Sequence, residues 1–478
     1  MDETGDVDVE EFRREGRRLV DWIAGYLADP ERYPVLSPLR PGAVRETIPA
    51  APPAAGEALA RILDDVPGTV LPGVTHWNHP GFFAYFPSSA AAPGILGEML
   101  AAALNVNGML WKTSPAATEM EMAVLDWLRQ MLGLPEGLFG VIQDTASAST
   151  LVALAAAREM VPGLDVKRSG LVGQARLRMY ASEEAHSSVE KAGIVLGIGQ
   201  DGCRKVPADA AFRLDVEALG RAIAEDRAAG FTPFAVTATV GTTSTTSIDP
   251  VPEIAALCAR EGLWLHVDAA YGGSAALDPG LRHVLAGAER ADSLVVNPHK
   301  WMFVPLDLSV LFTRRPQVVR AAFSLLPDYL RTAEEGAVPN LMDYGVSLGR
   351  RFRALKLWMV LRAFGHEGMA ARIREHVRLA RLFGDWVEKD ARFERMAPAP
   401  FSVVCFRGRF ERLPAAGQDD ANQRLMDAVN ATGEAYMSHT RVRGRLTLRL
   451  AVANLRTRER HVRRAWELIQ GEATRLGA

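Results

Sequence analysis

The chain has 478 residues, 48% of them hydrophobic, and its 55 basic and 57 acidic side chains leave a net charge of −2. This length predicts two or three domains, and the balanced charge argues against a nucleic-acid-binding or membrane-surface protein. The three widely spaced cysteines match neither a disulfide framework nor a metal-binding pattern. The acidic N-terminus is unlike a signal peptide and no apolar run is long enough for a membrane span, so we expect a cytoplasmic protein.

The first 70 residues have the pattern of a helical arm. Apolar residues at helical spacing predict one helix over residues 8–28 and a second over residues 57–65. The proline-rich stretch between them, residues 34–53, is typical of an extended connector. Because such an arm buries little surface by itself, we expect it to pack on another surface, and a partner subunit is the candidate.

Residues 75–89 are unusually rich in aromatic side chains and end in Pro87-Ser88-Ser89. Such a cluster indicates either core packing or a substrate pocket, and the sequence leaves both interpretations open. Two helices are expected next, over residues 90–104 and 118–132. Ser114-Pro115 supplies a favourable cap and first turn for the second.

Between residues 138 and 313, short apolar runs alternate with helical segments, which predicts a mostly parallel sheet covered on both faces. Ligands bind beyond the carboxyl ends of the strands in such sheets, so the loops after these strands should share one site. The expected strands are residues 141–142, 178–181, 235–240, 264–267, 294–296 and 308–312, and the expected helices are residues 150–160, 187–196, 216–227 and 251–260.

The C-terminal part predicts a smaller α+β unit. Helices are expected over residues 350–364 and 367–388, separated at Gly365. Three strands (residues 401–406, 436–439 and 445–451) and two helices (residues 421–431 and 457–470) should follow. We therefore expect an N-terminal helical arm over residues 1–85, a large domain over residues 86–364 and a small C-terminal α+β domain over residues 365–478.

Lys300 lies in the most informative stretch of the chain. The apolar run Leu294–Val296 reads as a buried strand that stops at Asn297-Pro298, because proline cannot continue a ladder. His299-Lys300-Trp301 follows directly, so the lysine lies at a strand end between two rings. A desolvated lysine becomes a neutral amine that can form a Schiff base with a carbonyl. The alternative is a loop lysine whose head reaches water.

Asp268 and His186 follow two other predicted strands. A carboxylate at the end of the buried strand 264–267 is costly unless it is paired, either with a structural arginine or with a cationic heterocycle. His186 lies at a strand-to-helix turn, where a histidine is more often a cap or a core residue. After strand 235–240, Gly241-Thr-Thr243 offers small residues and hydroxyls that leave room for a flat ligand.

The hydroxyl-rich run at residues 145–150 precedes an alanine-rich helix. Small residues and hydroxyls before a helix start make an anion site, although ordinary capping explains the same pattern. A lysine, a buried carboxylate, a histidine and a phosphate site on one sheet edge fit pyridoxal phosphate. The lysine would form the internal aldimine, and the carboxylate would keep the pyridine nitrogen protonated.

The chain resembles the group II pyridoxal-phosphate decarboxylases, specifically the aromatic-L-amino-acid decarboxylase family, over essentially its whole length. The matching stretches are Thr75-His-Trp77, Ala84-Tyr-Phe-Pro87, Ser114-Pro115 with Thr118-Glu119, Val141-Ile-Gln143 with Ala146-Ser147, Ala185-His-Ser-Ser-Val189, Val240-Gly-Thr-Thr243, His266-Val-Asp-Ala-Ala-Tyr271, Asn297-Pro-His-Lys300, Tyr329-Leu330 and Leu348-Gly-Arg-Arg-Phe-Arg353. The resemblance implies an α/β protein of fold type I, which is aspartate aminotransferase-like. It should have a mostly parallel seven-stranded large domain, a small C-terminal α+β domain and an N-terminal helical arm.

The resemblance also assigns roles to residues. Lys300 would hold the cofactor, Asp268 would face the pyridine nitrogen, and His186 would stack on the ring. The implied cofactor-binding residues are Ala146, Ser147, His186, Thr243, Asp268, Ala270, Asn297, His299 and Lys300. The implied substrate-binding residues are Trp77, Tyr85, Phe86, Ser88, Asn107 and Met109.

By the same resemblance, the reaction is decarboxylation of an L-amino acid, aromatic in this family, to an amine and carbon dioxide through an external aldimine and a quinonoid. Lys300, His186, Asp268 and Tyr329 would be catalytic, Tyr329 matching the loop tyrosine that donates the proton. Relatives with phenylalanine at the tyrosine position form aldehydes with consumption of oxygen, so Tyr329 favours decarboxylation. A non-catalytic scaffold is a remote alternative. The family is homodimeric, with each active site at the subunit interface.

Two stretches depart from the family pattern. The segment from Tyr329 to Leu348 is slightly shorter than usual, and Asp343-Tyr344 is not followed by the usual tryptophan. Asn107-Gly-Met109 falls where the family places bulky apolar residues facing the partner subunit's pocket. It therefore predicts a more polar or differently shaped side-chain site.

Overall fold

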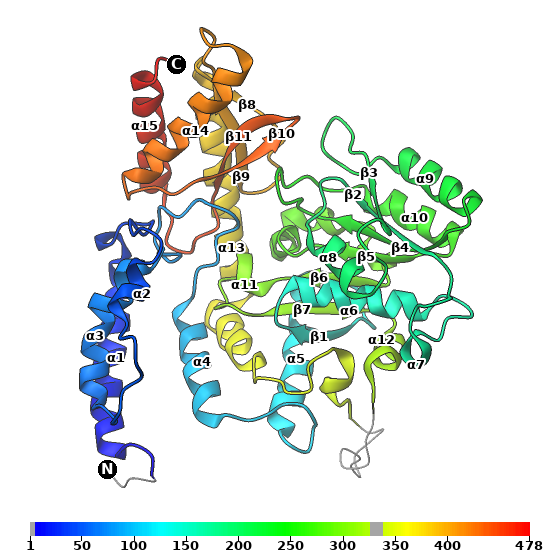
Figure 1. The fold of residues 1–478 in the computed structure, drawn as a ribbon, viewed down its shortest axis with the longest axis horizontal. Helices are drawn as coiled ribbons and strands as arrows, with labels where there is room; N and C mark the ends of the chain where they lie inside the picture. Colours follow the sequence, from blue (N-terminus) through cyan, green and yellow to red (C-terminus); the bar gives the residue numbers. More distant parts are fainter. Residues whose placement is uncertain (1–4, 326–337) are drawn as a thin grey trace.

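The computed structural model describes residues 5–325 and 338–478, and Tyr329 lies outside the described residues. The described residues contain a seven-stranded sheet in the order β1-β7-β6-β5-β4-β2-β3 (Figure 1). Only β7 runs antiparallel to its neighbours in this sheet, so the mostly parallel sheet is confirmed. The strands are β1 (Phe139–Gln143), β2 (Leu177–Ser182), β3 (Cys203–Val206), β4 (Thr232–Thr239), β5 (Trp264–Asp268), β6 (Ser293–Val296) and β7 (Ser309–Thr313).

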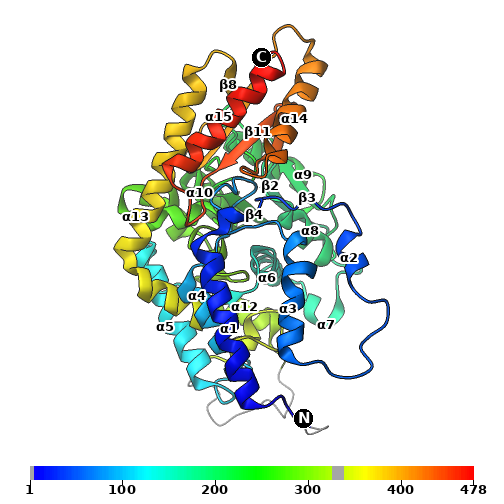
Figure 2. The same cartoon turned by 90° about the vertical axis from the view of Figure 1, so that its left-hand side faces the viewer.

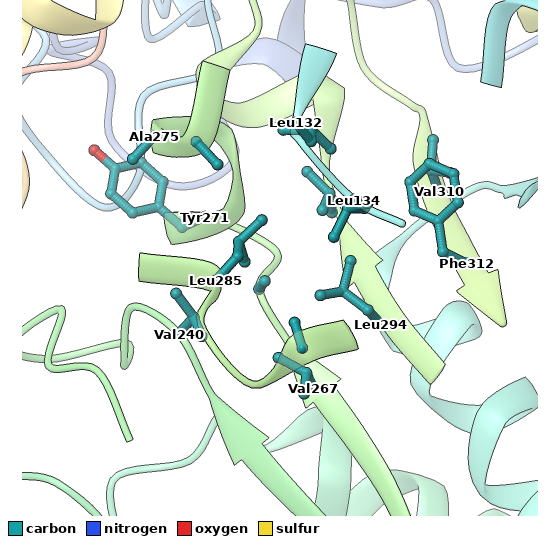
Figure 3. Packing of buried hydrophobic residues seen from close by; sticks show 14 of the residues in the cluster. Leu132, Leu134, Val240, Val267, Tyr271, Ala275, Leu285, Leu294, Val310 and Phe312 are labelled. Atoms are coloured by element: carbon teal, nitrogen blue, oxygen red, sulfur yellow. The ribbon is translucent and has the colours of Figure 1, made fainter. Parts of the chain in front are cut away.

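Apolar packing covers both faces of this sheet. The first helical layer contains α5 (Pro115–Met131), α9 (Val216–Ala228) and α10 (Val251–Glu261), and the second contains α6 (Ala146–Glu159), α8 (Ser188–Val195) and α12 (Pro316–Phe323). Figure 3 shows part of the first core, where Val267, Leu294 and Phe312 of adjacent strands face Leu134. A strand buried on both faces needs a continuous apolar run, and every residue of β5 is buried.

Strand β3 was missed by the sequence analysis because it lies at the edge of the sheet. Only its two end residues are buried, while Arg204 in the middle is half-buried and Lys205 is exposed. Charged side chains protect exposed edges against unwanted pairing, and they also remove the apolar run by which a strand is recognised.

The smaller sheet is antiparallel throughout, in the order β10-β11-β9-β8. Its strands are β8 (Phe393–Arg395), β9 (Val403–Gly408), β10 (Ser438–Val442) and β11 (Arg445–Ala451). Helices α14 (Ala415–Ala431) and α15 (Glu459–Arg475) cover it around a separate apolar core. Three of the strands were predicted, and the three-residue β8 was too short to be detected.

Helix α13 (Ala354–Lys389) runs between the two sheets (Figure 1). It packs on α4 (Ala92–Leu104) and α5 near its start and on β8 and β9 near its end. Gly365 interrupts it with φ 62° and ψ 174°, a conformation far from helical. The predicted pair of helices divided at Gly365 is therefore confirmed.

The N-terminal segment forms α1 (Val9–Ala28), α2 (Ala43–Thr47) and α3 (Leu59–Thr69), which lie along one side of the molecule (Figures 1 and 2). Helix α1 packs on α3, and α4 (Ala92–Leu104) follows the aromatic segment. The short elements are α7 (Val166–Ser169), α11 (Pro298–Trp301) and 3-10 turns at Pro30–Arg32, Leu71–Gly73, Gly272–Leu277, Pro279–Leu285, Ala288–Arg290 and Leu341–Tyr344. Across the described ranges, no helix combines the length and apolar character that a bilayer span requires.

Candidate active site

One edge of the large sheet gathers the predicted site residues. Strands β2, β4, β5 and β6 are parallel, so their carboxyl ends meet at this edge. Strand β1 shares their direction, because both β1 and β6 are antiparallel to β7. Asp268 is the last residue of β5. The segments that follow the strands carry His186, Thr243, the run Asn297–Lys300, and the start of α6 at Ala146.

Lys300 lies in the short helix α11, directly after β6, and its side chain is partly buried. Its Nζ is 5.1 Å from the centre of the Phe86 ring. Burial lowers the pKa of the Lys300 ammonium group, and the Asp268 carboxylate partly opposes this shift. The lysine is therefore directed at an aromatic side chain in a site that favours the neutral, nucleophilic amine, unlike a solvated surface lysine.

Asp268 is only 5% exposed, and its Oδ1 accepts the backbone N–H of Ala270 at 3.0 Å. Among the described residues, no arginine or lysine forms an ion pair with it. The structural arginine considered as its partner is therefore absent from that part of the chain. A buried carboxylate without a cation is costly, so the site fits a positively charged heterocycle such as the protonated pyridine ring of pyridoxal phosphate.

His186 is held as a neutral ring. Its Nδ1 accepts the backbone N–H of Ser188 at 3.1 Å and lies 2.9 Å from the Ser188 hydroxyl. Burial lowers the pKa of His186, and the nearby Lys300 acts in the same direction while Asp268 opposes it. Since Nδ1 is an acceptor, the single proton of the neutral ring is on Nε2. The ring can therefore stack on a flat ligand and donate through Nε2.

Asn297 and His299 support the backbone on either side of Pro298. Asn297 donates its backbone N–H to Ala270 O at 3.1 Å, while its buried Oδ1 has no hydrogen-bond partner among the described residues. His299 Nδ1 accepts the Leu308 N–H at 2.8 Å, and burial lowers the pKa of His299 to about 3. The hydroxyl of Ser88 donates to the backbone oxygen of His299. These contacts hold the loop that carries Lys300 from several directions.

The start of α6 offers backbone donors. Thr145 is the N-cap, and its Oγ1 accepts the Ala148 N–H at 3.4 Å. The first-turn N–H groups, including those of Ala146 and Ser147, have no intrahelical acceptor, as at every helix start. Ser147 is exposed. The capping interpretation of the hydroxyl-rich run is therefore confirmed. The anion site stays a prediction, which the free first-turn N–H groups favour.

The aromatic segment divides between core and site. Phe82 and Phe83 are fully buried, whereas Trp77 and Tyr85 are 40% and 51% exposed. Trp77 and Tyr85 stack with ring centres 6.0 Å apart, and the Tyr85 hydroxyl lies 3.0 Å from that of Tyr436. Phe86 stacks on the buried Tyr271 with ring centres 4.0 Å apart. The segment thus combines core packing with two exposed rings, and its half-buried Phe86 lies beside Lys300.

Three predicted residues have no recorded contact with Lys300 within the described part of the chain. Asn107 is exposed between α4 and α5, where its Oδ1 accepts the Arg350 N–H at 2.9 Å. Its Nδ2 lies 3.5 Å from the Met109 sulfur. Thr243 is exposed in the loop after β4. The roles predicted for these three residues, like those of the other site residues, stay predictions.

Arg449 was missed by the sequence analysis. This β11 residue is 4% exposed, and it donates from Nε to Ser244 O at 2.9 Å and from Nη1 to the Ser438 hydroxyl at 3.3 Å. Its buried Nη2 has no partner among the described residues, and its Cζ is 5.4 Å from the Phe86 ring centre. The available signal was an arginine within the apolar alternation of residues 445–451.

Comparisons with known proteins agree with this geometry. The family model described as the pyridoxal-dependent decarboxylase conserved domain matches residues 41–409. The phenylacetaldehyde synthase of Arabidopsis thaliana is 41% identical over 484 residues, covering 98% of this chain and 97% of that protein. The aromatic-L-amino-acid decarboxylase of Sus scrofa is also 41% identical, covering 98% of each. The crystal structure of Oryza sativa TDC with PLP and tryptamine has a TM-score of 0.95 at 40% identity, covering 99% of this chain and 100% of that one.

Lys300 facing Asp268 at the edge of a mostly parallel sheet is the arrangement of a fold type I pyridoxal-phosphate enzyme. The chain belongs to the pyridoxal-dependent decarboxylase family. It is therefore a carboxy-lyase whose cofactor is pyridoxal phosphate.

Proposed function

We propose that this enzyme converts an aromatic L-amino acid to the corresponding amine and carbon dioxide. The observation that carries the proposal is the buried Asp268 carboxylate, which has no ion pair in the described ranges and lies within electrostatic reach of Lys300. The exposed rings of Trp77 and Tyr85, in the same segment as the Phe86 ring that lies 5.1 Å from Lys300 Nζ, favour an aromatic substrate. Tryptamine in the rice structure and the names of the plant and pig relatives support the same substrate class.

The chain's own residues divide the work of holding the cofactor. When bound, pyridoxal phosphate supplies an electron-accepting ring for the electron pair of the breaking bond. Lys300 would bind it covalently through its neutral amine, and Asp268 would keep the positive charge at the ring nitrogen. The N–H groups of Ala146 and Ser147 would bind the phosphate, and His186 would stack on the ring. Thr243, Ala270, Asn297 and His299 would complete the cofactor site.

Arg449 would hold the carboxylate of the incoming amino acid. Its unpartnered Nη2 is buried, and its guanidinium lies near the same Phe86 ring that faces Lys300. A guanidinium donates strong, directional hydrogen bonds to a carboxylate. Nη2 of Arg449 has no acceptor among the described residues, so it is available for such a bond. Such a contact would fix the orientation of the amino acid relative to the cofactor, which decides which bond breaks.

The remaining substrate contacts would come from Trp77, Tyr85, Phe86 and Ser88, with Asn107 and Met109 of the neighbouring subunit lining the side-chain pocket. Tyr329 would return the proton to the substrate carbon. Its segment lies outside the described residues, so the proposal for Tyr329 rests on the sequence match to the loop tyrosine of the family.

We further propose a homodimer with the active site at the interface. Helix α4 exposes an apolar stripe at i, i+3, i+4 and i+8 spacing, formed by Leu96, Met99, Leu100 and Leu104. Helix α1 exposes further apolar side chains, namely Val9, Phe12, Leu19 and Val20. Contiguous exposed apolar surface of this kind typically marks an interface. The loop after α4 carries Asn107 and Met109, which such an interface would bring toward the partner's site.

The division into an arm over residues 1–85, a cofactor-binding domain over residues 86–364 and a small domain over residues 365–478 remains our proposal. It is supported by the two separate sheets, their separate apolar cores and the interruption of α13 at Gly365. A cytoplasmic location is proposed as well, because the three cysteines are free and buried, as expected in a reducing compartment.

The test is one assay of the purified holoenzyme against L-tryptophan, L-tyrosine, L-phenylalanine and L-glutamate, following carbon dioxide, amine and oxygen together. We expect carbon dioxide and amine in equal amounts from an aromatic substrate, without oxygen uptake. Aldehyde, ammonia and peroxide with oxygen consumption would instead identify an aldehyde synthase. A colourless protein that borohydride does not modify at Lys300 would identify a scaffold, and Lys300→Ala is the matching control.

Tyr329→Phe tests the proposed proton donor. Without the phenolic hydroxyl, protonation of the substrate carbon slows and oxygen can compete, so part of the product should change from amine to aldehyde. The amine-to-aldehyde ratio and the oxygen uptake measure this change. Unchanged amine output in the variant would remove Tyr329 from the mechanism.

A further inference from the structure

A second cavity lies at the opposite edge of the large sheet, where the parallel strands begin. Its volume is about 580 Å³, and it is bounded by the end of α6, the starts of β4 and β5, the end of α10 and the segments before β6 and after β7. Strand β5 begins in this cavity at Trp264 and ends at Asp268. The four residue steps from Trp264 to Asp268 span about 13 Å, so the cavity is separate from the catalytic edge.

The floor of the cavity is apolar. Phe234, Cys258 and Trp264 line it and are each less than 5% exposed. The indole N–H of Trp264 already donates to the Ser293 hydroxyl at 2.9 Å, so it is not available to a ligand. A concave site of this volume with an apolar floor is typical of small-molecule binding sites.

The rim of the cavity is basic. Arg290, Arg314 and Arg315 line it together with one carboxylate, Asp292. That carboxylate is fully engaged, because Oδ1 accepts from Arg315 Nε at 2.5 Å and Oδ2 accepts the Leu265 N–H at 2.9 Å. The rim therefore carries an excess of positive charge.

Within the described residues, two of the three guanidinium groups lack an acidic partner. In the described part of the chain, Arg290 donates only to the backbone oxygen of Pro252 at 3.2 Å, and the side chain of Arg314 has no hydrogen bond or ion pair. Both side chains are exposed at the mouth of the cavity. Their donors are free to bind an anion there.

We propose that this cavity binds a small aromatic carboxylate. The ring lies on the floor formed by Phe234, Cys258 and Trp264, and the carboxylate binds Arg290 and Arg314 at the rim. A guanidinium matches a carboxylate through paired N–H donors, which supplies both strength and orientation. The same rim repels cations, so an aromatic amine is excluded where the corresponding acid binds.

Equilibrium dialysis of the holoenzyme with the fluorescent probe 2-naphthoate tests the proposal. We expect saturable binding that weakens as salt is raised, because the contact is ionic. The neutral isostere 2-naphthamide should bind at least tenfold more weakly. Absence of saturable binding, or equal binding of acid and amide, overturns the proposal.

The double variant Arg290→Ala/Arg314→Ala locates the site. It should weaken 2-naphthoate binding at least tenfold and leave decarboxylation unchanged, because neither residue belongs to the catalytic edge. Arg221→Ala is the matched control, since Arg221 is an exposed arginine on α9 that does not line the cavity. If the double variant binds the probe as tightly as the wild type, the probe binds elsewhere, in the active site for example, and the proposal is wrong.

Discussion

The Asp268 carboxylate is buried and forms no ion pair among the described residues. The variant Asp268→Asn tests the role of its charge. The substitution keeps the shape of the side chain and removes the charge that would hold the ring nitrogen protonated. A hydrogen bond to a charged group contributes about 1.5–3 kcal/mol, so kcat should fall about 10- to 100-fold. Steady-state rates of carbon dioxide release measure this.

The same variant has a second expected effect, on Lys300. Because the Asp268 carboxylate opposes the lowering of the Lys300 pKa by burial, its removal should lower that pKa further. The rate at which the apoenzyme forms its imine with pyridoxal phosphate, measured against pH, should therefore shift toward lower pH. A shift toward higher pH would contradict the assigned electrostatics.

The titration of His266 should make the stability of the fold depend on pH. This residue is fully buried between the hydroxyls of Ser293, at 2.9 Å, and Thr150, at 3.3 Å, and burial lowers its pKa from 6.5 to about 4. A histidine with a lowered pKa stabilises the fold above pH 6.5, and this contribution is lost as the pH falls toward 4, because only the unfolded chain binds the proton readily.

His266→Gln should therefore weaken the acid sensitivity of the fold. Between pH 7 and pH 5, the free energy of unfolding should fall by about 2 kcal/mol less in the variant than in the wild type. Urea unfolding curves at the two pH values measure the difference. An equal or larger fall in the variant would show that His266 does not titrate in this way.

At the scale of elements, the sharpest local feature is the interruption of α13. Gly365 has φ 62° and ψ 174°, a region open essentially only to glycine, and an added Cβ would meet no atom within 4 Å. Gly365→Ala should therefore lower the free energy of unfolding by about 1–3 kcal/mol through backbone strain alone. Chemical unfolding monitored by circular dichroism measures this.

Gly471→Ala is the matched control for Gly365→Ala. Gly471 lies inside the regular helix α15, and an added Cβ there also meets nothing within 4 Å. Because alanine is the better helix former, this variant should raise the free energy of unfolding by about 0.5–1 kcal/mol. Equal effects of the two substitutions would show that the conformation at Gly365 is not strained for alanine.

At the scale of the whole molecule, the apolar stripe of α4 is the proposed dimer interface. Leu100 lies within the apolar stripe of α4 and is 49% exposed. Leu100→Glu places a charge there, which would be buried without a partner if the stripe forms the dimer interface. We expect the variant to be monomeric in light scattering and to lose most of its activity.

Val172→Glu is the corresponding control for assembly. Val172 is 96% exposed and lies outside α1 and α4, so a charge there should change neither the mass in solution nor the rate. A wild-type enzyme that is monomeric and fully active would contradict the proposed dimer.

The amino-acid sequence by itself determined the α/β class, most of the strands and the sheet edge that carries the candidate site. Strands buried on both faces must be continuously apolar, so β5 and β6 could be recognised, and a polar residue directly after such a strand stands out. Lys300, Asp268 and His186 were found for this reason. The parallel direction of their strands then places them at one edge.

Only the tertiary structure decided features that depend on which surfaces meet. Arg449 lies in a strand of the small sheet, and its burial beside Phe86 arises from packing of that sheet against the loop after β4. Packing also decides that Phe82 lies in the core while Trp77 is exposed. The sequence around the two aromatic residues does not distinguish them. The basic cavity at the far edge joins residues up to 158 positions apart, from Ala157 to Arg315, which no local pattern relates.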